Sequence, residues 1–496
     1  MKKNKAPKKT LFAYLLTFLL TTASLLAQVG IGTVTPDASS ILDIVSNDKG
    51  MLTPRMTTAQ KLAITSPANG LMVYDTDLKS FYFYDTTSVS WIRMNINSDG
   101  RLKYKLIKST DVLATVLADE LTAGGGSKYL LDSGTLYEIN GTINLNFPIE
   151  INNAYISGQD SSEDKLVRIS GDLFTGATGG SIRILTLSAP SGNVFNIDGG
   201  GTASLIFRDC IVAGSSSVGL LKNFALVFLS IVQYYANANG VIYENVGRLL
   251  LSNTGWFSNN TGIYEKLVGT FSLAAKQGGF SEVNGASIGF DVSSNPIITG
   301  DAILESTGFT GTLTTGKYVN PYTVGGYTGY NFNNNWNVRC PGIPTETDAS
   351  AVGDFAVDYP VGSGASTSFN TSNPSNIVKV QGVSTSTNLF RFSTDGGVSN
   401  RLKYLGKKKR IFQVTGSISF QVPAAGTYII YIAKNGTVIS QYKIYGRGLT
   451  TNDIVVLPLN ASVELSSNDY VEVYAQRYTG GTTDAIITPN MTLIIK

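Results

Sequence analysis

The sequence predicts an all-β protein in which a parallel right-handed β-helix is followed by a C-terminal antiparallel jelly roll, with a small α+β module at the N-terminus. The first observation is a repeat: a glycine and two apolar or aromatic residues recur at Gly219, Gly240 and Gly262, 21 and 22 residues apart. A fixed period in this range indicates stacked units that cannot each bury their own apolar face. The second observation is composition, because 52 of the 496 residues are Gly and only 15% are charged. This balance favours turn-rich strands over helices.

Five segments are expected along the chain: a signal peptide at 1–27, an N-terminal attachment module at 28–98, a helical cap or linker at 99–128, the parallel β-helix at 129–335 and the jelly-roll tip domain at 345–496. Removal of the first segment takes away five lysines, so that the 38 Lys and Arg fall to 33, against 35 Asp and Glu. The mature chain is therefore close to neutral. This charge gives no support to nucleic-acid binding or to a polybasic membrane contact.

The first segment has the pattern of a cleaved secretory signal. Lysines at 2–9 precede an apolar stretch at 11–20, and Ala27 stands before Gln28 at the expected cleavage point. The alternative is a membrane anchor, but the apolar run falls short of the roughly 20 residues that cross a bilayer. We therefore expect a secreted or cell-surface protein without a transmembrane span in the mature chain.

The chain has no histidine and two cysteines, Cys210 and Cys340. The absence of histidine excludes His-based acid-base catalysis, Ser-His-Asp triads and His metal sites. For the cysteines, a disulfide and two buried free thiols both stay open. Neither a metal site nor a cofactor is expected.

Within the attachment module, residues 56–64 are predicted to form one short helix with Thr57 or Thr58 as N-cap. Residues 71–74 and 81–84 have the pattern of a hairpin. Asp75, Asp77 and Asp85 could bind Ca²⁺, but turn capping explains them more simply.

The module has a distinctive order of short sequence motifs, at 29–36, 40–44, 49–60, 71–77 and 81–85, with Trp91 following. These motifs resemble an N-terminal segment of secreted surface and fibre proteins of Bacteroidota. The resemblance covers about 65 residues. It implies a surface context and no catalytic role.

Residues 99–130 carry the best helical pattern in the chain. Apolar residues spaced for one stripe precede Gly124, Gly125 and Gly126, which end the helix; they are Leu106, Val112, Leu113, Val116, Leu117 and Leu121. Stacked repeats need a cover over their exposed apolar end. We expect this helix to supply it.

From Tyr129 onward apolar and polar residues alternate with a period of two, as half-buried strands require. The alternation is clear at 129–131, 136–141, 142–145 and 148–151. These first strands and the later repeats resemble the start of pectin-lyase-like right-handed β-helices, including those of phage tailspikes. The coil is expected to run to about Phe332, with a boundary marked by the Asn-rich stretch at 331–336 and the Pro-Gly stretch at 341–344.

The last domain shows strands joined by turn signals. Asn435-Gly436 lies between two strand-like runs and is the strongest short hairpin signal. Residues 426–436, 469–473 and the apolar C-terminal strand resemble a jelly roll of the tumour-necrosis-factor/complement type, as found at the tips of trimeric fibres. The resemblance implies a homotrimer.

Two glutamates in the repeats are the weak candidates for catalysis. Glu244 and Glu265 each follow the glycine step, so we expect them to stack on neighbouring coils about 4.8 Å apart. A retaining glycosidase needs two carboxyl groups about 5 to 5.5 Å apart. The alternative, which we favour, is a solvated face on which Lys222 supplies the counter-charge. An enzyme is thus the second hypothesis, and it would be a glycoside hydrolase or a polysaccharide lyase.

Candidate ligand-binding residues lie between coil and tip and in a basic run: Tyr318, Tyr322, Tyr327, Tyr330, Trp336, Lys407, Lys408 and Arg410. The aromatic rings could stack on sugars, and burial under the last coil explains them equally well. The basic run either contacts an acidic glycan or is a solvated strand edge.

The leading hypothesis is a non-enzymatic, secreted, trimeric fibre or adhesin that presents its jelly-roll tip to a surface ligand, a glycan or another cell-surface receptor. The order of segments and the missing catalytic residues motivate it. Two alternatives stay open. One is a tailspike-like glycan depolymerase acting on the flank of the β-helix, and the other is a phage tail fibre that binds a host receptor.

Overall fold

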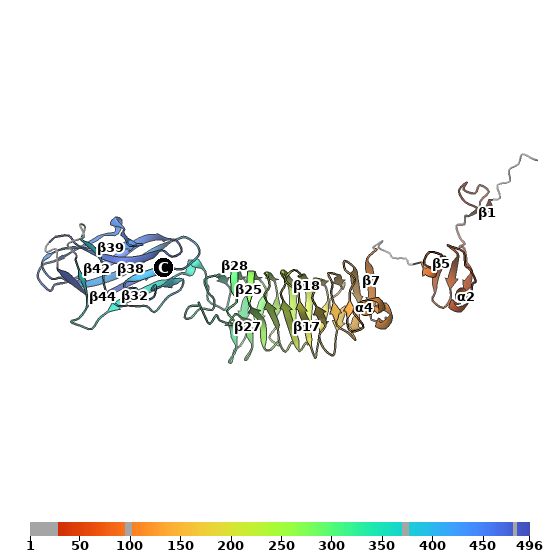
Figure 1. Cartoon of the computed structure of the whole chain (residues 1–496), viewed down its shortest axis with the longest axis horizontal. Coiled ribbons are helices and arrows are strands. Elements are labelled where there is room, and N and C mark those ends of the chain that lie inside the picture. Colours follow the sequence, from red (N-terminus) through yellow and green to blue (C-terminus); the bar gives the residue numbers. More distant parts are fainter. Residues whose placement is uncertain (1–27, 95–101, 370–375, 480–483) are drawn as a thin grey trace, which may run out of the picture. The chain divides into compact units, whose positions relative to one another are not determined.

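The computed structural model describes residues 28–94, 102–369, 376–479 and 484–496, so the predicted signal peptide lies outside the described residues. The chain divides into two compact units, residues 1–101 and 102–496. Figure 1 shows them in sequence colours, and each is described here by itself.

The described residues of the first unit form a two-stranded sheet, a four-stranded sheet and one helix. The two-stranded sheet contains β1 (Val29–Ile31) and β2 (Leu42–Ile44), the four-stranded sheet contains β3 (Arg55–Met56), β4 (Met72–Asp75), β5 (Ser80–Asp85) and β6 (Ser90–Arg93), and the helix is α2 (Thr58–Leu62). Thr57 is the N-cap and forms a capping box with Gln60, which satisfies backbone N–H groups at both positions. The hairpin expected around residues 75–80 is formed by β4 and β5.

Asp75 ties this unit together from the end of β4. Its carboxylate accepts hydrogen bonds from the Thr58 hydroxyl and from the backbone N–H of Asp77 and Leu78. The Lys61 ammonium lies 2.8 Å from it, and both side chains are buried. These contacts are those of a turn cap, and they leave the carboxylate little capacity for Ca²⁺.

The second unit begins with a parallel β-solenoid, whose strands form three faces. Among the described residues, the first face is a nine-stranded sheet. Its strands are β8 (Tyr129–Leu130), β11 (Ile149–Glu150), β14 (Phe174–Gly176), β17 (Asn193–Asp198), β19 (Ser217–Lys222), β21 (Val241–Glu244), β24 (Ile263–Val268), β27 (Ile288–Asp291) and β30 (Lys317–Asn320).

The second and third faces belong to one larger sheet, because two of its strands bend from one face into the other. The second face contains β7 (Tyr104–Lys108), β9 (Leu136–Asn140), β12 (Tyr155–Ser157), β15 (Gly180–Arg183), β18 (Ser204–Ala213), β20 (Leu226–Tyr235), β22 (Arg248–Ser252), β25 (Thr270–Gln277), β28 (Ile297–Glu305) and β31 (Trp336–Arg339). The third face contains β10 (Thr142–Asn144), β13 (Lys165–Val167), β16 (Thr186–Ser188), the second halves of β18 and β20, β23 (Gly255–Trp256), β26 (Phe280–Glu282) and β29 (Gly308–Thr310).

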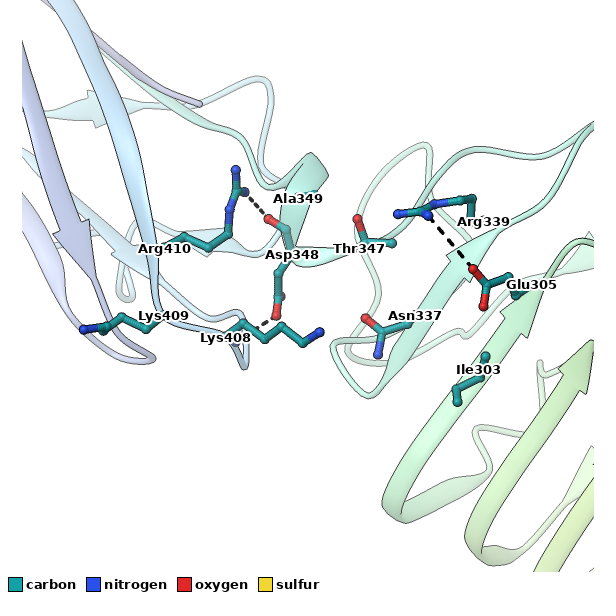
Figure 2. Close-up of a pocket in the computed structure, with 10 residues that line it drawn as sticks. All are labelled: Ile303, Glu305, Asn337, Arg339, Thr347, Asp348, Ala349, Lys408, Lys409 and Arg410. Carbon is teal, nitrogen blue, oxygen red and sulfur yellow. Dashed lines mark hydrogen bonds and ion pairs between the residues drawn. The ribbon is translucent and has the colours of Figure 1, made fainter.

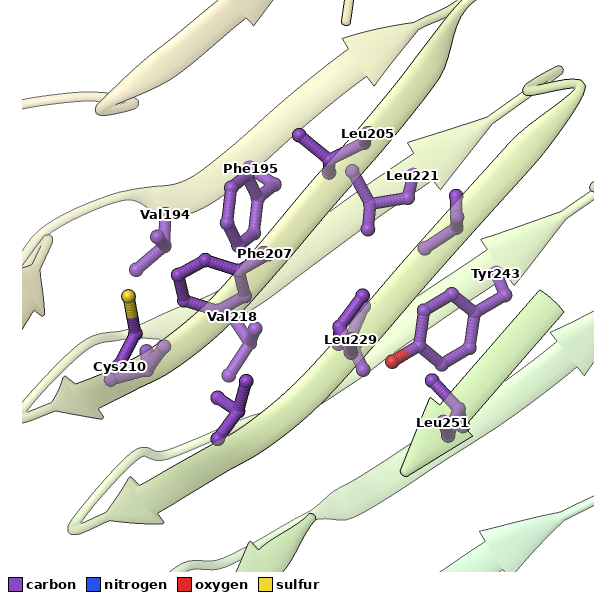
Figure 3. Close-up of a cluster of buried hydrophobic side chains, with 14 of the residues drawn as sticks. Val194, Phe195, Leu205, Phe207, Cys210, Val218, Leu221, Leu229, Tyr243 and Leu251 are labelled. Atoms are coloured by element: carbon purple, nitrogen blue, oxygen red, sulfur yellow. The ribbon is translucent and has the colours of Figure 1, made fainter. Parts of the chain in front are cut away.

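The predicted parallel coils are therefore present, while their right-handed sense stays a prediction. Inward side chains stack from coil to coil in one apolar core, and Figure 3 shows Phe195, Phe207 and Tyr243 within it. Aromatic rings also stack along the interior, with Trp256 lying 3.8 Å from Tyr234 and 5.0 Å from Tyr264 between ring centroids. Such stacking compensates for the small size of each repeat.

The corner between the second and third faces has a left-handed backbone in successive coils. The residues there have positive φ and are aligned by the strand register: Ile184, Asp209, Ile231, Asn253, Gly278 and Ser306. Glycine and asparagine adopt this conformation at little cost, whereas a β-branched residue is strained in it. The sharp bend that closes each coil therefore strains the backbone at Ile184 and Ile231.

The corner between the third and first faces is held by buried asparagines. Asn237 accepts a hydrogen bond from the backbone N–H of Ser215 and donates to the carbonyl of Val212. Asn260 accepts from the Asn237 backbone N–H and side chain and donates to the carbonyl of Tyr234. This asparagine ladder satisfies backbone groups that the turn leaves without sheet partners.

The start of the solenoid differs from the predicted single helix. Leu106 lies in β7, which pairs with β9, and only α3 (Leu113–Val116) and α4 (Ala118–Ala123) are helical. The backbone of residues 104–108 pairs with β9, and this strand pairing overrides the helical spacing of the leucines. Leu117 belongs to the solenoid core and Leu113 and Leu121 pack against it, so this segment covers the first coils.

The C-terminal domain is made of two antiparallel sheets with an apolar core between their inward side chains. One sheet contains β32 (Gly353–Asp358), β33 (Ala365–Ser368), β35 (Ser384–Thr385), β38 (Arg410–Gln421), β42 (Ile454–Leu465) and β44 (Ala485–Ile495). The other contains β34 (Ile377–Lys379), β36 (Phe392–Ser393), β37 (Arg401–Tyr404), β39 (Gly426–Lys434), β40 (Thr437–Val438), β41 (Ile444–Gly448) and β43 (Tyr470–Arg477). Short 3₁₀ turns, η1 (Asp348–Ser350) and η2 (Ser440–Tyr442), connect strands. The Asn435-Gly436 turn joins β39 to β40 as expected.

Both cysteines are free and buried. Burial raises the pKa of the Cys210 thiol to about 12. The described structure therefore has the free thiols that the sequence left open as one of two alternatives.

Candidate functional site

The candidate site lies where the last solenoid strand meets the C-terminal domain, and a buried arginine builds it. The Arg391 side chain is 1% exposed. It forms an ion pair with the Asp348 carboxylate and donates to the carbonyl oxygens of Trp336 and Glu346, at 2.5 and 3.0 Å. A planar guanidinium can hold several acceptors at once. Arg391 thereby joins β31, η1 and the C-terminal domain.

Asp348 also shapes the basic run. Its carboxylate accepts hydrogen bonds from the backbone N–H of Lys407 and Lys408, the latter at 2.8 Å. Arg410 donates to the Asp348 backbone carbonyl. Because the backbone N–H groups of the two lysines face the carboxylate, the run is fixed as a turn against η1.

A cavity of about 310 Å³ opens at this junction, and Figure 2 shows the side chains that surround it. Basic side chains come from both domains and outnumber the acidic ones; the charged lining residues are Arg339, Lys408, Lys409, Arg410, Glu305 and Asp348.

Some of these charges are already neutralised. Asp348 pairs with Arg391, Arg339 lies 4.0 Å from Glu305, and the Lys409 ammonium lies 3.1 Å from Glu464. Within the described residues, the Lys408 ammonium makes no ion pair. The cavity therefore offers an excess of cationic donors to an anionic group.

The predicted ligand-binding residues are only partly brought together. Lys408 and Arg410 line the cavity, and Lys407 lies next to it with its ammonium 3.4 Å from the Gly300 carbonyl. Arg339 and Asp348 were missed by the sequence reasoning. One signal was present: Arg391 stands between Phe390 and Phe392, and an arginine in an apolar strand needs a buried carboxylate partner.

The aromatic candidates pack the joint instead of forming an open surface. Trp336 and Tyr322 are buried, and the Trp336 indole N–H donates to the Tyr322 hydroxyl at 3.0 Å. Burial raises the pKa of Tyr322 to about 12. The prediction of a sugar-stacking surface is wrong for these two residues, because the last coil and the following loop cover them.

The other tyrosines are half-buried. Tyr330 stacks on Phe390 with ring centroids 4.0 Å apart, and Tyr327 meets the same ring edge-on at 5.2 Å. The Tyr318 hydroxyl donates to the Gly311 carbonyl. Tyr327 and Tyr330 thus contribute to the contact between solenoid and C-terminal domain.

The two catalytic candidates do not form the expected pair. Glu244 is aligned with Val268, and Glu265 with Val241. The coil from Val241 to Glu265 is longer than the glycine spacing predicted, so the carboxylates fall out of register. Glu244 lies on the surface 3.2 Å from Lys222, as the favoured alternative expected.

Glu265 lies inside the solenoid. Its carboxylate is 3.0 Å from the Lys276 ammonium, which also donates to the Thr254 hydroxyl, and it accepts a hydrogen bond from the Trp256 indole. Both charged side chains are at most 2% exposed. Buried charges in proteins are paired in this way. Glu265 therefore cannot reach a polymeric substrate on the flank.

The described residues contain no group of His, Cys, Asp and Glu that could hold a metal ion. Across the same residues, no helix is long and apolar enough to cross a membrane.

Comparison with known proteins finds a family that is similar to the N-terminal part of the chain. Residues 30–107 match the family described as "Phage tail like trimerisation region". No curated protein matches the chain. The similarity to a phage-tail-like trimerisation region therefore concerns the N-terminal segment of the chain.

Solved structures give weaker likenesses. Murine APRIL at pH 8.5 and at pH 5.0 is 8% identical in each case, with TM-scores of 0.19 and 0.20, over 29% of this chain and 98% of the other. The enzymatically active domain of bacteriophage CBA120 tailspike protein 4 is 10% identical, with a TM-score of 0.23, over 90% of this chain and 77% of the other. Similarity at this level carries no argument about function.

Proposed function

We propose that the protein is a secreted, homotrimeric fibre that binds a surface glycan without cleaving it. The match of residues 30–107 to a phage-tail-like trimerisation region carries the proposal. The parallel solenoid supports it, because stacked coils make a stiff element that can separate an attachment module from a binding domain. The proposal includes the Bacteroidota surface context and a jelly-roll C-terminal domain.

The mass of residues 28–496 in solution tests the assembly. Light scattering should give three times the monomer mass. A monomer mass across the accessible concentration range would contradict the trimer and leave the chain a single-copy binding protein.

The proposed binding site is the basic cavity at the junction, and its ligand is a glycan that carries carboxylate or sulfate groups. Cationic donors from β31 and the basic run converge there, and charge-assisted hydrogen bonds to an anion are stronger than neutral ones. Lys408 and Arg339 are exposed and hold no buried structure together, so they can be changed without loss of the fold.

An array of acidic and neutral glycans tests this site. We expect Arg339→Glu with Lys408→Glu to abolish acidic-glycan binding. Lys443→Glu with Arg447→Glu makes the same charge change at exposed positions of the C-terminal domain and should leave binding intact. Equal binding by both double variants would show that the ligand sits elsewhere.

A phage tail fibre that binds a host receptor is the second candidate, favoured by the family to which residues 30–107 are similar. The two candidates differ in whether the protein is exported with cleavage of its N-terminal segment. A cleaved N-terminus at about residue 28 on protein recovered from the medium or cell surface supports the cellular fibre, and an intact N-terminus on virion protein supports the tail fibre.

A further inference from the structure

One row of outward-facing side chains runs the length of the solenoid's second face. The strand register aligns Tyr104, Leu136, Tyr155, Ser181, Ile206, Phe228, Leu250, Ala275 and Ile303. We call these nine residues the shaft row. All except Ser181 are apolar or aromatic and none is charged, and the polar Asn337 follows Ile303 at the same register position in β31. In the middle coils their neighbours along each strand belong to the core, as Leu205 and Phe207 do on either side of Ile206, so the shaft row points outward.

The shaft row is partly open to solvent. Tyr155 is 53% and Ile206 36% exposed, and the other members are half-buried. The next outward position on each strand is a serine in the middle coils, at Ser230 and Ser252. In other coils this position is charged; the charged residues are Glu138, Arg183, Arg208, Glu305 and Arg339. The shaft row is therefore an uncharged strip that is flanked by polar and charged side chains.

The central outward row of the first face has a different composition. It contains Asn196, Leu220, Ile242, Lys266, Asp291 and Asn320. Lys266 and Asp291 lie 3.8 Å apart in an ion pair, in which the Asp291 side chain is buried. Charged residues can therefore occupy such a row, so the coil itself does not require the shaft row to be uncharged.

The shaft row begins within the segment that is similar to a trimerisation region. The family match ends at residue 107, inside β7, and Tyr104 in that strand is the first residue of the row. The matched segment therefore includes the first strand of the second face.

We propose that the shaft row is the surface along which three copies of this chain pack side by side. The inference rests on the proposed homotrimer and names the surface that holds it together. The centre of an interface between copies is depleted of charge and enriched in apolar and aromatic residues, as the shaft row is. Repetition over successive coils makes the contact long and narrow, which adds buried area with each coil.

Thiol labelling in the full chain from residue 28 tests the surface, because the two native cysteines are buried. Phe228→Cys places a thiol in the shaft row. Leu220→Cys is the matched control, since it is also half-buried and outward but lies on the first face. In the intact assembly we expect a small maleimide to label the Phe228→Cys thiol at least about ten times more slowly than the Leu220→Cys thiol, because a covered thiol reacts only through local opening.

A second pair of variants tests the assembly itself. Leu250→Arg should lower the mass measured by light scattering or increase its dependence on concentration, while Ile242→Arg on the first face should not. Equal labelling rates in a particle of trimer mass would overturn the shaft-row contact and leave the trimer standing. A monomer mass for the unsubstituted chain would overturn both. Protection that appears only when polysaccharide is added would assign the row to a glycan and overturn the inference.

Discussion

At the scale of single residues, two buried carboxylates organise the structure more than any surface charge. Asp348 binds Arg391 and fixes the basic run, and Asp75 fixes the turn and helix of the N-terminal unit. The ion pairs of both carboxylates could not be read from spacing, because Arg391 and Lys61 lie far from them along the chain. Asp75 was expected to cap a turn, but its buried lysine was not foreseen.

Replacement of Asp348 should destabilise the junction strongly. Asp348→Ala leaves the Arg391 guanidinium buried without a counter-charge, and breaking such a pair costs about 3 to 5 kcal/mol. We expect this loss in the free energy of unfolding of the C-terminal domain, measured by urea denaturation. Asp358→Ala, at an exposed carboxylate, should change it by less than about 0.5 kcal/mol. A small effect at Asp348 would mean that water reaches Arg391.

Acid should loosen the N-terminal unit through Asp75. Burial raises its pKa, but hydrogen bonds from Lys61, the Leu78 N–H and Thr58 outweigh it and lower the pKa from 3.8 to about 2. A lowered pKa means that the carboxylate stabilises the fold above its ordinary value and that this contribution is lost as the pH falls from 3.8 to about 2. Hydrogen exchange over residues 58–85 should rise in that window.

The variant Asp75→Asn gives the comparison for this pH effect. Its exchange over residues 58–85 should already be faster at pH 7 and should change less on acidification. Unchanged exchange of the unsubstituted chain down to pH 2 would contradict the assigned role of the carboxylate.

At the scale of elements, one corner of the solenoid contains strained backbone. A β-branched residue with positive φ costs about 1 to 2 kcal/mol, and Ile231 is one, 52% exposed. Ile231→Asn should therefore raise the free energy of unfolding by about 1 kcal/mol, since Asn253 occupies the same corner one coil further on. The midpoint of chemical denaturation measures it.

The control for this change is Ile242→Asn, at a strand position that is 39% exposed. Asparagine is unfavourable in strands, so this variant should lose stability. If both variants lose stability equally, the corner isoleucine is held by packing that outweighs its backbone strain.

The asparagine ladder should be far less tolerant. Asn237→Ala leaves the Ser215 N–H and the Val212 carbonyl without their partner in a buried corner, which costs about 1 to 3 kcal/mol for each group left unpaired. Asn239→Ala, two residues away and exposed, should have little effect. Equal stability of the two variants would show that a water molecule replaces the Asn237 amide.

Some elements could be predicted from the sequence pattern, and others could not. The strand content, the hairpins at 75–80 and at Asn435-Gly436, and the short helix capped by Thr57 could be predicted, because each depends on neighbours in sequence. β7 was predicted as helix because Leu106 fits the helical apolar stripe, whereas its pairing with β9 depends on residues that lie further along the chain. The alignment of Glu244 with Glu265 was predicted from equal glycine spacing, whereas the longer coil shifts one against the other.

At the scale of the whole molecule, the two units should unfold separately. The two large apolar clusters of the described chain are made of residues from the second unit. The N-terminal unit has its own sheet, with Asp75 and Lys61 buried in it. We therefore expect limited proteolysis in mild urea to remove residues 28–94 and to leave a stable product covering 102–496. Simultaneous loss of both units would show that they share one cooperative transition.

The sequence by itself determined the all-β class, the repeating coils, the missing histidine chemistry and the local turns, because these follow from composition and from contacts between near neighbours. Only the tertiary structure decided which residues share a site. It joined Arg339, Asp348, Arg391 and Lys408 at one junction, buried Glu265 against Lys276, and aligned the shaft row. The physical reason is register: a coil that is longer by two residues moves every side chain after it relative to the coil before. Spacing along the chain cannot fix that offset, but the hydrogen bonds between parallel strands do.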